Sequence, residues 1–176
     1  MKPIAFFLLV MTMNTSTPIF DFTKNSNISS WRIVDDVVMG GRSNGQFGLN
    51  SNGHGKFSGE VSLENNGGFS SLRYDMETLN VSSYTKVCIT LKGDGKPYQF
   101  RVKANKNERY SYIKTFKTSG TWETISINLN EMYPAFRGRI LNYPNFNKTT
   151  IEEIAFLIGN KKAEKFELLI DSIVLK

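Results

Sequence analysis

Short segments in which apolar and polar residues alternate constrain the fold of this chain more than any other feature of its sequence. In the segment 57–64, the odd-numbered positions are Phe, Gly, Val and Leu, whereas the even-numbered positions are Ser, Glu, Ser and Glu. Successive side chains of a β-strand point to opposite faces, so this pattern predicts a strand with one buried face. Similar segments recur from Ile19 onward at roughly 8 to 15 residue intervals, separated by turns rich in Gly and Asn. Long helical periodicity is missing, which indicates an all-β protein.

Two such segments surround a Gly-Asp-Gly turn at 93–95. Residues 87–91 precede the turn and residues 98–102 follow it, each with apolar side chains at every second position. We therefore expect a β-hairpin here. The polar face of its second strand would carry Gln99, Arg101 and Lys103.

Later segments complete the set of expected strands. Residues 110–117 lead through a Ser-Gly turn into 122–129, whose Ile and Leu side chains would point inward. The segment 134–144 is interrupted by Pro and Gly and is expected to be a loop. Residues 151–158 are apolar apart from Glu152 and Glu153, which favours a central strand, and 166–175 is a further strand.

Length and composition favour one domain. A chain of 176 residues with 40% apolar and 12% aromatic residues is long enough to bury a single core. We expect about eight or nine short antiparallel strands with at most one or two helical turns. Two stacked sheets bury the apolar faces of such strands, so the predicted fold class is an all-β sandwich.

The N-terminal segment 1–17 differs from the rest of the chain. Residues 4–13 are almost wholly apolar and follow Lys2. About ten apolar residues match the hydrophobic region of a secretory signal peptide and are too few to span a bilayer. The segment predicts export to the periplasm or the extracellular space. The alternative is a short uncleaved hydrophobic N-terminus on a cytoplasmic or membrane-associated protein. In both cases the folded domain is expected at 18–176.

Charge and cysteine content narrow the classes of function. The formal net charge is +6, but Lys and Arg alternate with acidic and apolar residues instead of forming a run. This pattern indicates a solvated surface and argues against nucleic-acid binding. The single cysteine, Cys88, excludes an internal disulfide and a multi-cysteine metal site. Its strand-like surroundings favour a packing role.

The acidic pair Asp35-Asp36 raises the question of catalysis. Neighbouring residues of an extended chain point to opposite faces, so these carboxylates cannot flank one scissile bond. We expect them to bond to backbone amides of the Gly40-Gly41 turn or to an arginine such as Arg42. The only histidine, His54, lies in a turn without partners for a catalytic triad. The sequence therefore predicts a protein that is not an enzyme.

No cofactor is expected from the sequence. His54 has neither a second histidine nor a nearby cysteine with which to share a metal ion. Asp21 and Asp171, together with backbone carbonyl oxygens, would form a structural calcium site if the fold brought them together. Calcium is therefore the one metal that the sequence leaves open.

Aromatic residues beside polar ones suggest a surface for a sugar ring. The rings that could form a flat platform for the sugar are those of Trp31, Tyr98 and Trp122. The polar groups that would bond the hydroxyls of such a sugar are Asp94, Gln99 and Arg101. The alternative is that these large aromatic side chains cap the core near strand ends.

A second candidate surface contains Arg137 and Arg139. Both follow the aromatic segment 133–136 in a region expected to be a loop. Arg and aromatic side chains are favoured in protein interfaces, so this patch suits a protein partner or an anion.

Several motifs occur in the order found in one protein family. They are Trp31 with Asp-Asp-Val-Val-Met-Gly-Gly-Arg-Ser at 35–43, Phe-Ser-Gly at 57–59, Gly-Gly-Phe at 67–69, Gly-Asp-Gly-Lys-Pro-Tyr at 93–98, Trp122, and Pro-Ala-Phe-Arg-Gly-Arg at 134–139. This ordered set resembles the complex I intermediate-associated protein family, and the resemblance covers about 19–175. It implies a galactose-binding-like jelly roll of two antiparallel sheets, in agreement with the strand pattern.

The resemblance also implies a function. Mitochondrial members of this family are assembly factors that hold intermediates of respiratory complex I, with chaperone-like binding and no known catalytic residues. A non-catalytic module for protein partners is thus expected, with residues 35–43 and 137–139 as its contact surface. Relatives of the fold include carbohydrate-binding modules, so the alternative ligand is a glycan outside the cytoplasm. The N-terminal segment departs from the long Arg- and Ser-rich transit segment of mitochondrial members and favours envelope partners.

Overall fold

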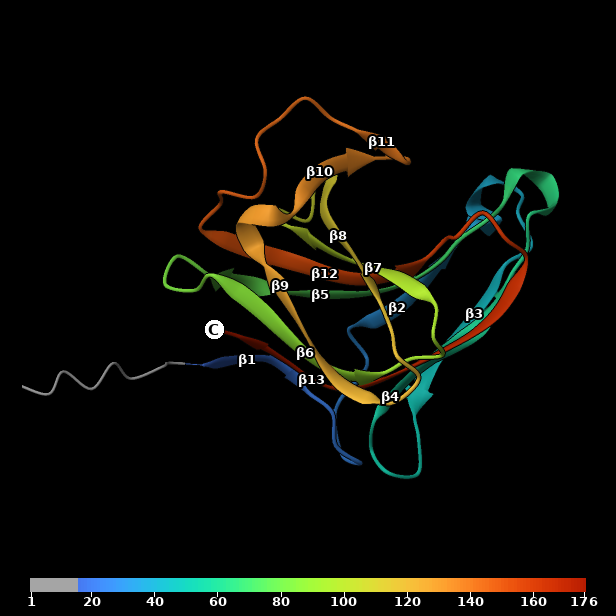
Figure 1. Ribbon diagram of the computed structural model, residues 1–176, viewed down its shortest axis with the longest axis horizontal. Coiled ribbons are helices and arrows are strands. Elements are labelled where there is room, and N and C mark those ends of the chain that lie inside the picture. Colours follow the sequence, from blue (N-terminus) through green and yellow to red (C-terminus); the bar gives the residue numbers. More distant parts are fainter. Residues whose placement is uncertain (1–15) are drawn as a thin grey trace, which may run out of the picture.

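The computed structural model describes residues 16–176, so the apolar segment 4–13 of the expected signal peptide lies outside the described residues. Two antiparallel sheets are stacked face to face (Figure 1). Sheet A has the order β3 (Asn44–Leu49), β4 (Gly55–Val61), β13 (Glu164–Leu175), β6 (Lys86–Lys92) and β9 (Trp122–Asn128), and β1 (Thr17–Asp21) also pairs with β13. Sheet B has the order β11 (Arg139–Ile140), β10 (Tyr133–Phe136), β8 (Ser111–Lys117), β7 (Pro97–Lys103), β12 (Thr150–Ile158), β5 (Ser70–Asn80) and β2 (Trp31–Asp35). The all-β sandwich and its jelly-roll architecture are confirmed.

The position of β12 follows from its composition. This strand pairs with β7 on one side and with β5 on the other, and nearly all of its residues are buried. A strand with neighbours on both edges is screened from solvent, and even its outward-facing residues Ala155 and Leu157 are buried. The expectation of a central strand at 151–158 is therefore confirmed.

Strand β13 holds sheet A together. It pairs with β6 along one edge, and along the other edge with β4 through Ile170 and then with β1 from Ser172. The register shifts between Ile170 and Ser172, which places Asp171 in a β-bulge. The Asp171 carbonyl accepts a hydrogen bond from the Phe22 amide at 2.8 Å, so the bulge also anchors the segment after β1.

The core lies between the sheets and is built from alternate residues of each strand. Sheet A contributes side chains such as Phe57 and Ile89, and sheet B contributes Leu72, Phe100 and Phe156, all of them fully buried. Burying one such side chain contributes about 1.5 to 3 kcal/mol to stability. The intervening residues of sheet B point away from sheet A, and this outer face carries most of its polar side chains.

The structure corrects the number of elements. The described residues contain thirteen strands where about eight or nine were expected. They also contain three short 3-10 turns, η1 (Asp36–Met39), η2 (Glu64–Asn66) and η3 (Leu129–Glu131), where one or two helical turns were expected. The extra strands are mostly short edge segments such as β2 and β11, whose few residues give only a weak alternation.

The expected hairpin at 87–102 is wrong. Strand β6 belongs to sheet A and β7 to sheet B, so the Gly-Asp-Gly turn carries the chain from one sheet to the other. Both strands point alternate apolar residues into the same core, and for this reason their sequences read like the two arms of a hairpin. The same holds for β8 and β9, which also lie in different sheets.

The segment 134–144 also differs from the expected loop. Its first half forms the short hairpin β10–β11, which turns at Arg137 and Gly138 with positive φ angles of 48° and 76°. Figure 1 shows this hairpin and the loop that follows it on the side of sheet B that faces away from sheet A. Within residues 16–176, no helix has the length and apolar character needed to cross a membrane.

Candidate binding surface

The outer face of sheet B carries a row of side chains that crosses six strands. Paired positions place these residues side by side in the order Arg32, Arg73, Ala155, Arg101, Ile113 and Tyr133. In the neighbouring row, Asp75, Glu153 and Lys103 are partners across β5, β12 and β7. We call the charged members of both rows the outer-face cluster: Arg32, Arg73, Asp75, Arg101, Lys103 and Glu153.

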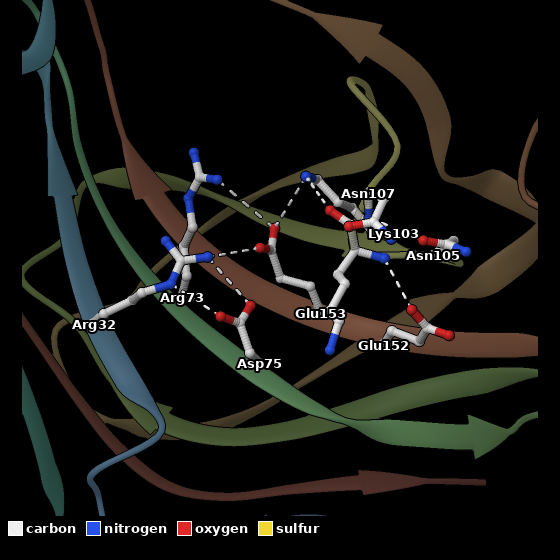
Figure 2. A network of polar contacts seen from close by, with 9 residues as sticks. Arg32, Arg73, Asp75, Lys103, Asn105, Asn107, Glu152 and Glu153 are labelled. Atoms are coloured by element: carbon white, nitrogen blue, oxygen red, sulfur yellow. Dashed lines mark hydrogen bonds and ion pairs between the residues drawn. The ribbon is translucent and has the colours of Figure 1, made fainter.

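Glu153 lies at the centre of the outer-face cluster, as Figure 2 shows. Its carboxylate accepts a hydrogen bond from Arg32 Nη2 at 3.1 Å. Lys103 Nζ and Arg73 Nη1 approach its Oε1 atom to 3.8 Å and 3.9 Å. Only 5% of the Glu153 side chain is exposed, so three cations from three strands surround a buried acid.

Asp75 completes the ion pairs on one side of Glu153. Arg32 donates from Nε and Nη2 to the two Asp75 oxygens at 3.0 Å and 3.2 Å, a bidentate arrangement. The hydrogen bond from Arg32 lowers the pKa of Asp75, whereas burial raises the pKa of Glu153 and the charges of Lys103 and Arg73 offset only part of that rise. Asp75 is thus negatively charged, and both of its carboxylate oxygens accept hydrogen bonds from Arg32.

Arg101 is held differently from the other cations of the outer-face cluster. Its Nε and Nη2 atoms both donate to Gln99 Oε1, at 3.0 Å and 2.6 Å. Among residues 16–176, no carboxylate oxygen lies within 4.0 Å of its guanidinium group. Burial and, secondarily, the positive charge of Arg73 lower the pKa of Arg101 to about 10. Arg101 therefore remains charged at neutral pH without a carboxylate partner.

The β10–β11 hairpin forms one rim of this face. The guanidinium carbons of Arg109 and Arg137 lie 5.2 Å and 5.4 Å from the centre of the Phe136 ring, which is within the range of cation–π contact. Arg137 and Arg139 are both exposed at this rim. The expectation of two accessible arginines beside an aromatic ring agrees with this geometry.

Apolar side chains on the same rim are unusually accessible. Ile140 is 72% exposed and Tyr143 is 59% exposed. The Tyr143 ring lies 5.6 Å from the Tyr110 ring, centre to centre. A shallow pocket of about 440 Å³ opens here, and its lining residues are Arg109, Tyr110, Phe136, Leu141 and Tyr143.

Asp35 and Asp36 are buried and hold loops together. Asp35 accepts hydrogen bonds from the Gly45 amide at 2.8 Å and the Ser70 hydroxyl at 2.5 Å. Asp36 accepts from the Ser43 amide and hydroxyl at 3.0 Å and 2.6 Å, and from the amides of residues 68 and 69. Backbone amides bind both acids, as expected, but they are not those of Gly40 and Gly41. Neither carboxylate is available to a ligand in this arrangement.

Arg42 lies at the other edge of sheet B. It pairs with Glu64 at 3.0 Å, and both side chains are well exposed, so it does not pair with Asp35 or Asp36. Residues 35–43 follow β2, whereas 137–139 join β10 to β11, and these strands are at opposite edges of the sheet. The two loops expected to form one contact surface are therefore separated by the whole outer face.

The three candidate rings do not form one platform. Trp31 and Tyr98 are 6% and 1% exposed, and both belong to the hydrophobic core. Trp31 stacks on Tyr74 inside the sandwich at 4.7 Å, and the Tyr98 hydroxyl donates to Asp94 at 3.0 Å. The prediction of a shared sugar platform is corrected, because inward-facing positions of β2 and β7 bury these rings against the opposite sheet.

Trp122 and Asp94 also lie away from the outer face of sheet B. Trp122, 44% exposed at the start of β9 in sheet A, contacts the His54 ring at 4.6 Å between centres. Asp94 accepts from Lys96 Nζ at 2.7 Å and from the Glu167 amide at 3.1 Å, which fixes the turn between the sheets. Of the predicted ring and polar groups, Gln99 and Arg101 are on the outer face.

The described residues contain no cluster of three or more His, Cys, Asp or Glu side chains arranged to hold a metal ion. Asp171 Oδ1 lies 3.1 Å from His54 Nδ1, and the Asp21 carbonyl accepts a hydrogen bond from Ser26. The calcium site at Asp21 and Asp171 stays a prediction, since two carboxylates with backbone oxygens and water are enough for calcium.

Sequence reasoning missed most of the outer-face cluster. Arg32, Arg73, Asp75 and Glu153 come from three strands that are far apart in the chain, and no local motif joins them. The one available signal was the acid pair Glu152-Glu153 in the otherwise apolar segment 151–158. A buried acid in a central strand requires cationic partners, but their identity depends on strand order.

The comparisons with known proteins agree with this fold. The sequence pattern described as "Complex I intermediate-associated protein 30" matches residues 20–170. The chain belongs to this family. It is 22% identical to the mitochondrial complex I intermediate-associated protein 30 of Mus musculus over 189 residues, an alignment that includes 92% of the chain and 56% of the mouse protein. The chain thus spans about half the length of that relative.

Two solved structures with the same fold are a carbohydrate-binding module and an agarase. A family 11 carbohydrate-binding module from Clostridium thermocellum, in complex with a β-1,3-1,4-mixed-linked tetrasaccharide, superposes with a TM-score of 0.67 at 15% identity, over 91% of this chain and 94% of the module. An agarase superposes with a TM-score of 0.60 at 11% identity, over 92% of this chain and 24% of the enzyme. At these identities the likeness concerns the fold alone.

Proposed function

We propose that this family member is a non-catalytic binding module that holds a protein partner in the manner of an assembly factor. Family membership supports this proposal, since the mouse relative is named for its association with complex I intermediates. The partner by this reasoning is a subunit or intermediate of a membrane-bound respiratory complex. The proposal concerns this domain, which matches about half of the mouse protein.

The observation that carries the proposal is that the outer-face cluster and an apolar rim lie on the same side of sheet B. The outer-face cluster contains Arg101, a cation without a carboxylate partner among the described residues. The rim exposes Ile140 and Tyr143 beside two arginines. Arg and aromatic side chains dominate the binding energy of protein interfaces, and exposed apolar groups at the edge gain energy when a partner covers them.

A capture experiment tests this proposal. The tagged chain is incubated with detergent-solubilised membranes of its source cells, and captured proteins are identified by mass spectrometry and by co-migration on native gels. Subunits of a respiratory complex should be recovered with the wild type. The double substitution Arg137→Ala/Arg139→Ala should reduce that recovery.

A matched control is Lys165→Ala, which removes an exposed cation from the outer side of sheet A. Its capture should equal that of the wild type. Unchanged recovery with the arginine variant would show that the rim does not contact the partner. Recovery of no respiratory subunit would contradict the proposed partner class.

A glycan is the second candidate ligand. It is supported by the fold shared with a module that holds a tetrasaccharide, and by the accessible Tyr143 ring next to Tyr110. Sugar rings stack on exposed aromatic faces, so Tyr143→Ala should abolish binding to any polysaccharide that the wild type retains. Titration calorimetry against a panel of neutral and acidic polysaccharides checks this, and no heat across the whole panel would eliminate the glycan.

The compartment separates these two functions. The mouse relative is mitochondrial, whereas residues 4–13 favour export by their composition. We propose that the domain acts in the compartment that contains its respiratory partner or, for a glycan, in the cell envelope. Sequencing the N-terminus of the mature protein in each cell fraction decides between them.

A further inference from the structure

Within residues 16–176, Arg73 and Arg101 are the two arginines of the outer-face cluster that donate no hydrogen bond to a carboxylate. They flank Ala155 on the two neighbouring strands β5 and β7. The nearest carboxylate oxygen to Arg73 is Glu153 Oε1 at 3.9 Å, beyond hydrogen-bonding distance, and Arg101 has only the amide oxygen of Gln99. The two arginines therefore flank one small residue on neighbouring strands, and neither donates a hydrogen bond to a carboxylate of the described chain.

Both carboxylates of the cluster accept their hydrogen bonds from Arg32. Asp75 is held by both Nε and Nη2 of Arg32, and Glu153 accepts from Arg32 as well (Figure 2). The outer-face cluster contains four cations and two acids, so it carries an excess of two positive charges. Lys103 and Arg73 approach the same oxygen of Glu153 at 3.8 Å and 3.9 Å, and Arg101 has no carboxylate partner among the described residues, so the excess lies on these three cations and includes both arginines.

Such an arrangement is unfavourable in the free protein. A half-buried guanidinium group loses part of its hydration, and a like charge nearby adds repulsion. An anion between the two groups would accept charge-assisted hydrogen bonds from both, and the planar guanidinium fork matches the two oxygens of a carboxylate. The pKa of Arg101, lowered by burial and by Arg73, agrees with a site that lacks its counter-charge.

We infer that Arg73 and Arg101 form an anion subsite on the outer face of sheet B that takes a carboxylate from an acidic segment of the protein partner. This inference rests on the proposed function, because it names the chemistry of the partner at the same surface. An acidic protein segment is favoured over an acidic polysaccharide by the adjoining rim, where Ile140 and Tyr143 offer apolar contacts to partner side chains. Tyr133 stands in the same row, beyond Ile113, between the subsite and that rim.

The test uses defined polyanions with the full chain. Poly-L-glutamate represents an acidic polypeptide, polygalacturonate an acidic polysaccharide, and mixed-linked β-glucan a neutral one. The variants are Arg73→Gln and Arg101→Gln. Lys165→Gln is the matched control, since it lowers the net charge equally from the outer side of sheet A. Circular dichroism and thermal melting establish that each variant is folded.

Poly-L-glutamate should bind the wild type, and each arginine variant should bind it about tenfold more weakly, as expected for loss of a charge-assisted contact. The control should stay within about twofold of the wild type. Arg101→Lys should recover only part of the affinity, because it keeps the charge but loses the planar fork.

Equal weakening in all three Gln variants would overturn the subsite, since it would show binding to diffuse positive charge. Arg101-dependent binding of polygalacturonate in place of poly-L-glutamate would overturn the polypeptide ligand and assign the site to an acidic polysaccharide. Capture of the respiratory partner that is unaffected by Arg101→Gln would overturn the subsite while leaving the proposed function intact. Arg101-dependent binding of poly-L-glutamate without any captured respiratory subunit would support the subsite and remove the proposed partner.

Discussion

At the residue scale, the buried carboxylate of Asp36 accepts four hydrogen bonds, which come from two separate loops. Burial raises the pKa of Asp36. The hydrogen bonds from the Ser43 hydroxyl and from the amides of residues 68, 43 and 69 together lower the pKa by more, so it lies below its ordinary value. Asp36 thus stabilises the folded state in its charged form. The acid that first suggests chemistry serves to fix the edge of sheet B.

Substitution of Asp36 should destabilise the protein. Asp36→Asn keeps the shape but turns an NH2 group toward N–H donors, and we expect a loss of about 1 to 3 kcal/mol in the free energy of unfolding. Because the folded-state pKa is lowered, the stabilisation is fully present above the unfolded pKa of about 4 and is lost as the pH falls through the folded value. Urea unfolding of wild type and variant between pH 7 and pH 3, a range chosen around that unfolded pKa of about 4, checks both points.

The exposed Asp21 provides the control, since Asp21→Asn removes the same charge without breaking a buried network. A stability difference between wild type and Asp36→Asn that persists undiminished in acid would contradict the role given to the Asp36 charge.

Two substitutions in the outer-face cluster should act in opposite directions on stability. Arg101→Met removes a half-buried charge that lacks a carboxylate partner and should raise the free energy of unfolding by about 0.5 to 1 kcal/mol. Glu153→Gln leaves Arg32 and Lys103 without their shared carboxylate and should lower it by about 1 to 3 kcal/mol. Thermal and urea unfolding measure both. A strong destabilisation by Arg101→Met would indicate that this residue serves the fold and not a ligand.

At the element scale, the β3–β4 hairpin shows how closely two strands approach at a glycine. A Cβ atom at Gly59 would lie 2.1 Å from the backbone oxygen of Asn44, in the paired strand. At Gly48, in β3 of the same hairpin, no atom lies within 4 Å of an added Cβ. The close approach of the paired strand therefore requires a glycine at position 59, whereas no steric contact with the described residues requires one at position 48.

Gly59→Ala should destabilise the protein by about 2 to 4 kcal/mol, because the clash involves backbone that cannot move without breaking strand pairing. Gly48→Ala should change stability by less than about 1 kcal/mol. Chemical denaturation of both variants measures the difference. Equal effects at the two positions would contradict the strand register described for β3 and β4.

The elements also show what local sequence determines. Alternation at 57–64 and the apolar run at 151–158 predicted β4 and β12, since burial of one or both faces leaves a direct mark on residue order. The Gly-Asp-Gly turn was predicted as a hairpin turn and instead connects the sheets. A tight turn between two alternating segments is compatible with both outcomes, and only the strand order of the whole fold distinguishes them.

At the scale of the whole molecule, the same limit applies to the binding surface. Arg101 was predicted to face outward because its strand alternates, whereas Arg32, Arg73 and Glu153 become its neighbours only through the order of β2, β5, β12 and β7. Trp31 and Tyr98 were placed on a surface because large aromatic residues suit both cores and platforms. The sandwich as a whole decides which face each residue occupies.

We propose above all that the outer face of sheet B receives an acidic segment of the partner at Arg73 and Arg101. Titration of the isotopically labelled chain with the captured partner, followed by NMR of backbone amides and arginine side chains, tests it most directly. We predict that the largest chemical-shift changes occur in β5, β7 and β10, with the Arg101 Nε–H signal among them. Changes confined to sheet A, around Trp122 and His54, with Arg73 and Arg101 unaffected, would contradict the account.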